Sequence, residues 1–354
     1  MSTGPATARG ELRAVDLFSG CGGLTLGLKR AGFKVIAAVE CEDGAVEAYI
    51  LNHPDVAKVY AQDIREVSGK QILDDAGLAV GELDLLAGCP PCQGFSRVNT
   101  LNGKRGEDDS RNDLVYQYLR LVEELNPLAL LMENVPALMQ DARYATLRAR
   151  VSELGYHVSD EVHDAAEYGV PQRRRRLIML AAKNASPLIP DKVPQNARTT
   201  VRTAIASLSE SAGTSGDPAH DVAAKRQPHV EDLIRRIPHD GGSRKDLGAE
   251  AQLECHRRCD GFFDVYGRMK WDDVSPTITS GFPSPSKGRF LHPTEDRTIT
   301  PREAGLLQTF PDDYKFPMRL GKYPVAQMIG NALPPRLAEV HASAIAEVLR
   351  APRQ

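Results

Sequence analysis

The sequence lacks the features of membrane, secreted and disordered proteins. It has no apolar run that approaches the ~20 residues needed to cross a bilayer, and Met1–Gly10 lacks the apolar core of a signal peptide. Its six cysteines in 354 residues are too few for a disulfide framework, which favours a reducing compartment and a cytoplasmic protein. Hydrophobic residues (42%) and charged residues (26%) are in the proportions of a folded, soluble enzyme.

Net charge is also small, −3, which for the whole chain argues against a polyanionic partner. The charge is unevenly distributed, however. Residues 172–290 hold 20 Lys and Arg against 14 Asp and Glu, a net of +6, which leaves −9 for the remainder. A basic module within an acidic body predicts that one face meets a polyanion, although an unevenly charged solvated surface would give the same count.

The first 180 residues alternate strand and helix signals. This alternation predicts an α/β fold with a parallel sheet wrapped by helices, in which ligands bind beyond the carboxyl ends of the strands. Helices are expected at Leu24–Ala31 and Ala45–Leu51. The predicted strands are Arg13–Phe18, Lys34–Val39, Val56–Ala61, Leu83–Ala87, Leu128–Met132, His157–Val162 and Arg176–Ala182.

The pattern changes after Ala182, and the length of the chain predicts about two domains. We expect a catalytic and cofactor-binding domain at 1–182, completed by 321–354, and a smaller, irregular domain at 183–320. Within the latter, Thr300-Pro301-Arg302-Glu303 predicts a capped helix start. A last helix should begin at Pro334/Pro335 and pack on the first domain through Leu337, Val340, Ile345 and Val348.

A glycine-rich turn follows the first predicted strand. Gly20, Gly22 and Gly23 would let the backbone approach a ligand, and Glu40, twenty residues after Gly20, could hold the two hydroxyls of a ribose. The spacing is not GxGxxG, so a nucleoside without a diphosphate fits better, with S-adenosylmethionine the obvious candidate. Asp63 could bind the adenine amine, although an aspartate in such a turn is more often a helix cap.

The segment Cys89-Pro90-Pro91-Cys92 directly follows the strand 83–87 and allows three interpretations. It could be a redox dithiol, but the polar stretch after it looks like a loop and not a helix. A zinc site would need a second pair, and Cys255 and Cys259, with His256 between them, have poor spacing for one. We favour a nucleophilic cysteine, with buried structural thiols as the remaining alternative.

Two further segments provide partners for such a cysteine. The strand 128–132 ends in Glu133, which would lie on the same rim if consecutive strands are neighbours. A carboxylate beside a thiolate suits a heterocyclic electrophile that needs protonation while sulfur adds. Four consecutive arginines, 173–176, offer guanidinium groups for a carbonyl oxygen or phosphate, with Arg173 and Arg175 more readily explained as solvated.

Together these motifs resemble the DNA (cytosine-5) methyltransferase family, in family order from residue 16 to the C-terminal helix. The stretch from about 183 to 271 lies outside the shared motifs. The resemblance implies a Rossmann-like S-adenosylmethionine-dependent methyltransferase sheet, with the irregular domain as target-recognition domain. The matching segments are Asp16–Gly23 (cofactor loop), Pro90–Gln93 (Pro-Cys loop), Glu133–Val135 (ENV), Gln172–Arg176 (QxRxR), Thr300–Tyr314, and Gly330–Pro335 (GN motif).

The resemblance also implies roles for individual residues. Cys92 would add to C6 of a flipped-out cytosine, Glu133 would bind the N3/N4 edge, Arg176 would hold O2, and Arg174 would support that site. Gln93 and Ser96 would face the DNA, and the polar loop 97–113 would close over the base. The cofactor residues would be Phe18, stacked on adenine, with Gly20, Gly23, Glu40, Asp63, Ile64 and Asn331.

The implied substrate is a specific sequence in duplex DNA, and the setting is a bacterial cytoplasm, with nucleoid association through DNA. A monomer is expected, without a metal, and a separately acting restriction endonuclease is an optional partner. One alternative is a tRNA cytosine-5 methyltransferase, but its Cys-Phe-Thr tripeptide is absent. The other is a catalytically inactive DNA-binding regulator. The basic residues expected to serve recognition are Arg235, Arg236, Arg244, Lys245, Arg257, Arg258 and Arg268.

Overall fold

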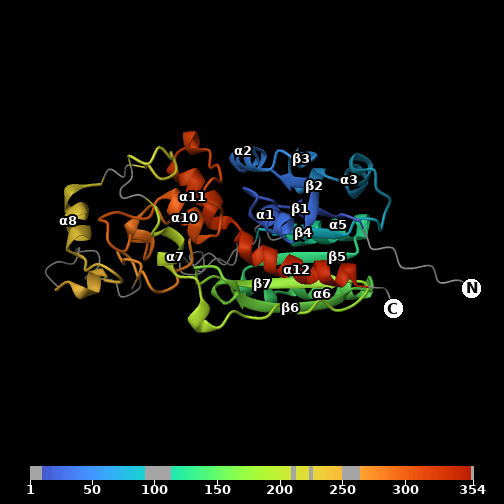
Figure 1. The fold of residues 1–354 in the computed structure, drawn as a ribbon. Coiled ribbons are helices and arrows are strands. Elements are labelled where there is room, and N and C mark those ends of the chain that lie inside the picture. The colour runs from blue at the N-terminus through green and yellow to red at the C-terminus, as the bar shows by residue number, and fades with distance from the viewer. Residues whose placement is uncertain (1–9, 92–112, 209–212, 223–225, 249–263, 352–354) are drawn as a thin grey trace, which may run out of the picture. The chain divides into compact units, whose positions relative to one another are not determined.

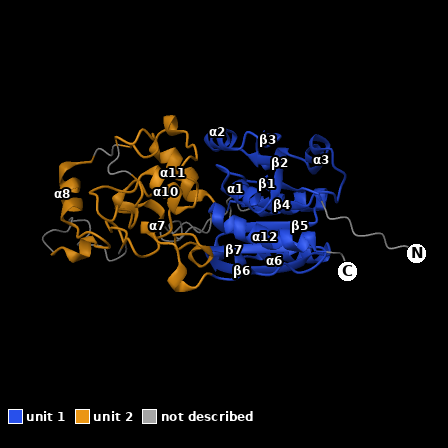
Figure 2. Ribbon diagram, in the orientation of Figure 1, with its two compact units in different colours: residues 1–164, 175–192, 333–354 blue, residues 165–174, 193–332 orange. Residues whose placement is uncertain are grey.

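A computed structural model describes residues 10–91, 113–208, 213–222, 226–248 and 264–351. The chain forms two compact units (Figures 1 and 2). Unit 1 comprises residues 1–164, 175–192 and 333–354, and unit 2 comprises 165–174 and 193–332. The main boundary thus falls ten residues after the predicted one at 182/183, and residues 321–332, expected in the first domain, belong to unit 2.

Unit 1 is built on a seven-stranded sheet with the order β3-β2-β1-β4-β5-β7-β6. The first five strands pair in parallel, as predicted. The last two do not, because β7 runs antiparallel to both β5 and β6. Only ten residues join β6 to β7, too few for the crossover that a parallel pair requires. The strands are β1 Leu12–Leu17, β2 Phe33–Glu40, β3 Lys58–Ala61, β4 Leu85–Gly88, β5 Ala129–Asn134, β6 His157–Asp164 and β7 Arg175–Ala182.

Helices cover both faces of this sheet (Figure 1). Helices α3, α5 and α6 bury one face in a continuous apolar core, whereas α1, α2 and α12 lie on the other. No helix within the described ranges is long and apolar enough to span a membrane. The helices are α1 Gly23–Arg30, α2 Asp43–Asn52, α3 Gly69–Ala76, α5 Leu114–Leu125, α6 Ala142–Glu153, α7 Val201–Ile205, α8 Pro228–Arg236, α10 Pro301–Leu307, α11 Lys322–Asn331 and α12 Pro335–Arg350.

The C-terminal helix packs on α1 at very close range. A Cβ added to Gly27 would lie 2.4 Å from the Cβ of Ala338 and 2.6 Å from the carbonyl oxygen of Pro335, so only glycine allows this approach. Of the four residues predicted to form the apolar face of this helix, two are buried. Leu337 and Ile345 are buried, but Val340 and Val348 are only partly so, because alanines and His341 complete the packed face.

Unit 2 has little regular structure in its described parts, as expected, and depends on local hydrogen bonds. The capping box predicted at the start of α10 is present: the Thr300 hydroxyl accepts from the backbone N–H of Glu303, and the Glu303 carboxylate accepts from that of Thr300. A small apolar core forms around Leu233, Ile234 and Tyr266.

Arg268 is fully buried beside this core, although the sequence suggested it as a DNA-contacting residue. Its guanidinium donates to the backbone carbonyls of Ile234, Ile237, His292 and Glu295 and to the carboxylate of Asp296. Arg244 is buried as well. Neither side chain is on the surface, so both are unsuited to contact DNA directly.

We expect Arg268→Met to destabilise unit 2 by about 3 kcal/mol or more, because it leaves buried acceptors and Asp296 without their donor. Arg236→Met is the matched control, since Arg236 is exposed on α8 and should change stability by no more than about 0.5 kcal/mol. Urea unfolding, monitored by limited proteolysis, measures the stability of both variants. Equal stability of the two variants would contradict a structural role for Arg268.

Candidate active site

The glycine turn after β1 and the end of β2 form one site. The backbone N–H of Gly20 donates to Glu40 at 2.8 Å, and the N–H groups of Cys41 and Glu42 donate to its other carboxylate oxygen at 2.9 Å each. Gly20 and Gly22 both have positive φ, +55° and +95°, which glycine adopts without strain. The glycine turn and Glu40 therefore lie together, and α1 begins at Gly23.

Phe18, the residue between β1 and the glycines, also has a positive φ, +59°. This conformation is uncommon for a bulky side chain and occurs preferentially at functional sites. Asp63 accepts from the backbone N–H of Arg65 and forms an ion pair with its guanidinium at 2.8 Å, so it caps a short 3-10 helix, Ile64–Glu66. Ile64 is buried in the core.

The loop after β4 meets the end of β5. Gly88 is in register with Met132, which brings Cys89 level with Glu133. The Asn134 side chain donates to the carbonyl of Pro90 at 2.8 Å and accepts from the backbone N–H of Val135. Asn134 is therefore the residue that ties the ENV segment to the Pro-Pro-Cys loop, a role that the motif alone did not indicate.

Strand β7 contributes a positively charged side chain, Arg176, to this rim. The Nε of Arg176 lies 2.7 Å from Oε1 of Glu133, and the two side chains are only 15% and 9% exposed. The antiparallel pairing of β5 and β7 places them together, since Asn134 is opposite Leu177. A carboxylate held by a guanidinium therefore lies beside the cysteine loop.

Two further groups near this rim have shifted pKa values. Burial and the carboxylates of Glu133 and Asp16 raise the pKa of the Cys89 thiol well above its usual range, so this thiol stays protonated at neutral pH. Burial likewise raises the pKa of Asp16 to about 7. Asp16 accepts a hydrogen bond from the Thr25 hydroxyl at 2.7 Å, and its other oxygen, Oδ1, has no hydrogen-bond partner among the described residues.

The raised pKa of Asp16 makes stability depend on pH. Between about pH 4 and 7 the unfolded chain has lost this proton while the folded chain keeps it, so the contribution of Asp16 to stability falls as pH rises. We expect the free energy of unfolding of the wild type, relative to Asp16→Asn, to fall by about 2 kcal/mol from pH 5 to pH 7. Urea unfolding at both pH values measures this difference. Parallel pH profiles for the two proteins would contradict it.

Arg174 and Asn331 belong to unit 2. Arg174 is 2% exposed and donates to the carbonyls of Ile278, Gly330 and Ala332 at 3.1 Å each. The preceding Gln172 is also buried and exchanges hydrogen bonds with Ile278 and Gln308. Both side chains thus hold the backbone of unit 2. Asn331 ends α11 and is exposed.

Several predicted positions lie outside the described residues. They include Cys92, Gln93, Ser96 and nearly all of the expected closing loop 97–113. The Cys255, His256 and Cys259 cluster is outside them too. The structure therefore describes the surroundings of the Pro-Pro-Cys loop up to Pro91.

One group in unit 2 has the composition of a metal site: His292, Glu295 and Glu303 bring their ligand atoms within 4.8 Å of one another. Arg297, however, donates to both oxygens of Glu303 at 2.7 Å and to Glu295 at 2.8–2.9 Å. A guanidinium that already donates hydrogen bonds to both carboxylates explains the cluster as an ion-pair network.

The Rossmann-like sheet, the glycine turn facing Glu40, and the Glu133–Arg176 pair beside a Pro-Pro-Cys loop define the class of S-adenosylmethionine-dependent methyltransferases. Residues 12–347 match the model of the C-5 cytosine-specific DNA methylase family, and the chain belongs to this family.

Known relatives agree with this assignment. The chain is 38% identical to the Type II methylase M.HgiDII of Herpetosiphon aurantiacus, over 95% of each chain. It is 30% identical to the Type II methyltransferase M.AgeI of Thalassovita gelatinovora, over 94% of this chain and 99% of that one. A solved structure from E. coli, described as a prophage-encoded DNA modification methyltransferase, has a TM-score of 0.70 at 27% identity and covers 96% of this chain and 100% of its own.

The family membership confirms the predicted fold class and activity. The protein is a DNA (cytosine-5-)-methyltransferase, which transfers a methyl group from S-adenosylmethionine to C5 of cytosine in DNA. The two relatives named above are a Type II methylase and a Type II methyltransferase. The tRNA methyltransferase and the inactive regulator are correspondingly disfavoured.

Proposed function

We propose that Cys92 is the nucleophile and that Glu133 and Arg176 activate the cytosine ring. The observation that carries this assignment is the Glu133–Arg176 ion pair at the end of β5, bonded through Asn134 to the loop that leads to Cys92. The other cysteine of the motif is disfavoured, because the raised pKa of Cys89 keeps its thiol protonated, and the thiolate is the reactive form.

In this mechanism the Cys92 thiolate forms a bond to C6 of a flipped-out cytosine, which makes C5 nucleophilic. Glu133 binds the N3/N4 edge and favours protonation of N3, while Arg176 holds O2, so that charge developing in the ring is offset. S-adenosylmethionine supplies the electrophilic methyl group. Loss of the C5 proton, with water as its acceptor, then expels the thiolate and restores the aromatic ring.

We assign Arg174 a positioning role within the same site. Its hydrogen bonds to three backbone carbonyls leave it holding the segment that leads into β7, and Arg176 follows two residues later as the second residue of that strand. Arg174 would therefore support the O2 site by orienting Arg176, without contacting the base.

For the cofactor, Glu40 would bind the ribose hydroxyls, since three backbone N–H groups already orient its carboxylate. Phe18 would stack on the adenine from its unusual backbone conformation, and Gly20 and Gly23 would allow close approach to the methionine moiety. The other proposed contacts are Asp63 to the adenine amine, Ile64 beside the adenine, and Asn331 near the methionine moiety.

The proposed substrate is a specific sequence in duplex DNA, with Gln93 and Ser96 facing it and unit 2 reading it. Exposed basic residues such as Arg235, Arg236 and Lys245 are available for backbone contacts. We expect a monomer without a metal that associates with the bacterial nucleoid through DNA. A restriction endonuclease, where one accompanies the chain, would act separately.

Covalent trapping tests this proposal. A duplex carrying 5-fluorocytosine at the target position should form a denaturation-resistant complex in the presence of S-adenosylmethionine, because fluorine cannot leave as the C5 proton does. Bisulfite sequencing of DNA from cells that express the chain identifies the target. Transfer of tritiated methyl groups to tRNA and not to duplex DNA would overturn the proposed substrate.

A further inference from the structure

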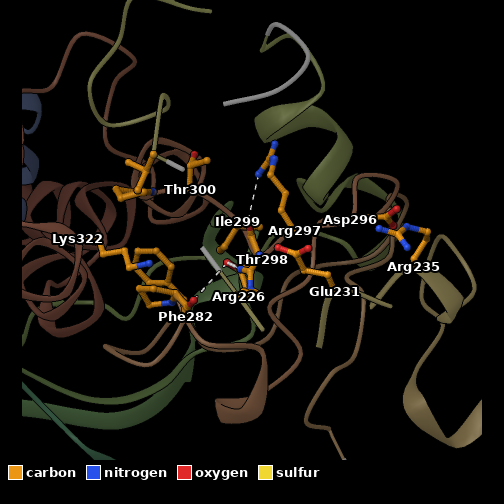
Figure 3. A pocket seen from close by; sticks show the side chains of 13 residues that line it. Arg226, Glu231, Arg235, Phe282, Asp296, Arg297, Thr298, Ile299, Thr300 and Lys322 are labelled. Carbon is orange, nitrogen blue, oxygen red and sulfur yellow. Dashed lines mark hydrogen bonds between the residues drawn. The ribbon is translucent and has the colours of Figure 1, made fainter. Parts of the chain in front are cut away.

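Unit 2 contains a pocket that the methyl-transfer site does not use. It has a volume of about 270 Å³ and lies between α8, the segments 282–283 and 296–301, and the first residue of α11 (Figure 3). Four of its lining side chains are basic, namely Arg226, Arg235, Arg297 and Lys322, and two are acidic, Glu231 and Asp296. The pocket is therefore basic, and the partners of each charged group show which cations remain available.

Two of the basic groups have carboxylate partners. Arg297 is held by both oxygens of Glu303 and by Glu295. Arg235 faces Asp232 on its own helix at 3.7 Å. Asp296, one of the two acidic groups, already accepts from the buried Arg268 at 2.5 Å. Arg297 and Asp296 therefore have little charge left for a ligand, whereas the Arg235–Asp232 pair is solvent-exposed and weak.

Arg226 and Lys322 differ from the other two, since neither has a carboxylate within 4.0 Å among the residues that the structure describes. Arg226 is half-buried, and within the described part of the chain its guanidinium donates one hydrogen bond, from Nη2 to the Thr298 hydroxyl at 2.8 Å (Figure 3). Burial lowers its pKa, and Glu231 opposes this only through longer-range attraction. A guanidinium has five N–H donors, so this one is both poorly solvated and incompletely bonded.

An oxyanion in the pocket would compensate for both the poor solvation and the incomplete hydrogen bonding of the Arg226 guanidinium. The planar guanidinium fork matches two oxygens of a phosphate, and Lys322 would add a second positive charge at the start of α11, where the helix dipole also favours an anion. With Glu231 counted against them, Arg226 and Lys322 leave a net positive charge. The pocket volume of about 270 Å³ is several times the ~30 Å³ that a water molecule occupies, so a phosphate group can enter.

We propose that this pocket binds a backbone phosphate of the DNA, with Arg226 as the bidentate ligand and Lys322 as the second cation. The proposal rests on DNA as the substrate of the enzyme, and it adds a contact that fixes the register of unit 2 without reading a base. Local sequence patterns do not predict this pocket, because Arg226 and Lys322 are nearly a hundred residues apart.

Affinity for duplex DNA as a function of salt tests the proposal. With a 20-base-pair duplex of target sequence and one of unrelated sequence, Arg226→Gln and Lys322→Gln should each weaken binding several-fold for both duplexes, and each should reduce the slope of log K against log salt by about 1. Lys70→Gln is the charge-matched control: it removes one positive charge from an exposed position on α3 of unit 1, outside the pocket, and should leave affinity and slope close to wild type.

Other outcomes would overturn the proposal. Unchanged slopes in both pocket variants, at unchanged melting temperatures, would show that no DNA phosphate binds there. If inorganic phosphate raised the melting temperature of the wild type but not of Arg226→Gln, while DNA affinity stayed the same, the ligand would be a free phosphate. Because binding is measured without methyl transfer, a failure here is distinct from a failure of the Cys92 mechanism.

Discussion

Cys92→Ser should lower the rate of methyl transfer by at least about 1,000-fold and abolish covalent trapping on 5-fluorocytosine DNA. The nucleophile must be an anion to add to C6, and a serine hydroxyl is far less ionised at neutral pH than a thiol. Affinity for duplex DNA should remain close to wild type, because one sulfur atom is exchanged for oxygen. Single-turnover transfer of tritiated methyl groups measures the rate, and a filter or gel assay measures the affinity.

Cys89→Ser is the control for this prediction, since it makes the same exchange in the same Cys-Pro-Pro-Cys segment. Its thiol is protonated and faces Glu133, so a hydroxyl can replace it as a neutral group, and covalent trapping should persist. If Cys89→Ser were inactive and Cys92→Ser active, the two cysteines would have exchanged roles. If both formed the trapped complex, the covalent mechanism through this segment would be wrong.

Structural features that depend on residues close together in the sequence were predicted better than those that depend on residues far apart. The seven strands of the sheet in unit 1 all lie within a few residues of their predicted positions, because hydrophobic patterns are local. The alternation of the arginine run was also predictable: Arg173 and Arg175 are exposed, while Arg174 and Arg176 are not. Long-range pairing was less accessible. Strand β7 runs antiparallel to its neighbours because the segment between β6 and β7 is short. From the sequence, this segment was interpreted as another crossover between parallel strands.

Charge was the weakest guide to individual roles. A count of Lys and Arg treats all members alike, but Arg268 and Arg244 are buried, and Arg174 is bonded to carbonyls more than a hundred residues away. None of these partners can be found from local sequence. The family resemblance correctly brought Glu133 and Arg176 together, because motif order specifies which strand ends share a rim.

Glu133→Gln should lower the single-turnover rate by about 100- to 10,000-fold, the range expected when a positioned acid–base group is lost. The amide keeps the shape of the side chain but cannot share a proton with N3, and it removes the partner of Arg176 at 2.7 Å. Glu161→Gln is a closely matched control. Glu161 lies on β6 and pairs with the same residue of β7, Ile178, as Glu133 does. It is exposed, and β7 separates it from Glu133, so Glu161→Gln should retain full activity.

A double-mutant cycle separates the two roles that the ion pair allows for Arg176. If Arg176 acts only by orienting Glu133, Arg176→Met should add no loss to a protein that already carries Glu133→Gln. If Arg176 also holds O2 of the cytosine, as proposed, the double variant should be at least about tenfold slower than Glu133→Gln alone, since a charged hydrogen bond contributes about 1.5–3 kcal/mol. A rate for Glu133→Gln within tenfold of wild type would exclude the carboxylate from proton transfer, and equal rates for the single and double variants would limit Arg176 to positioning.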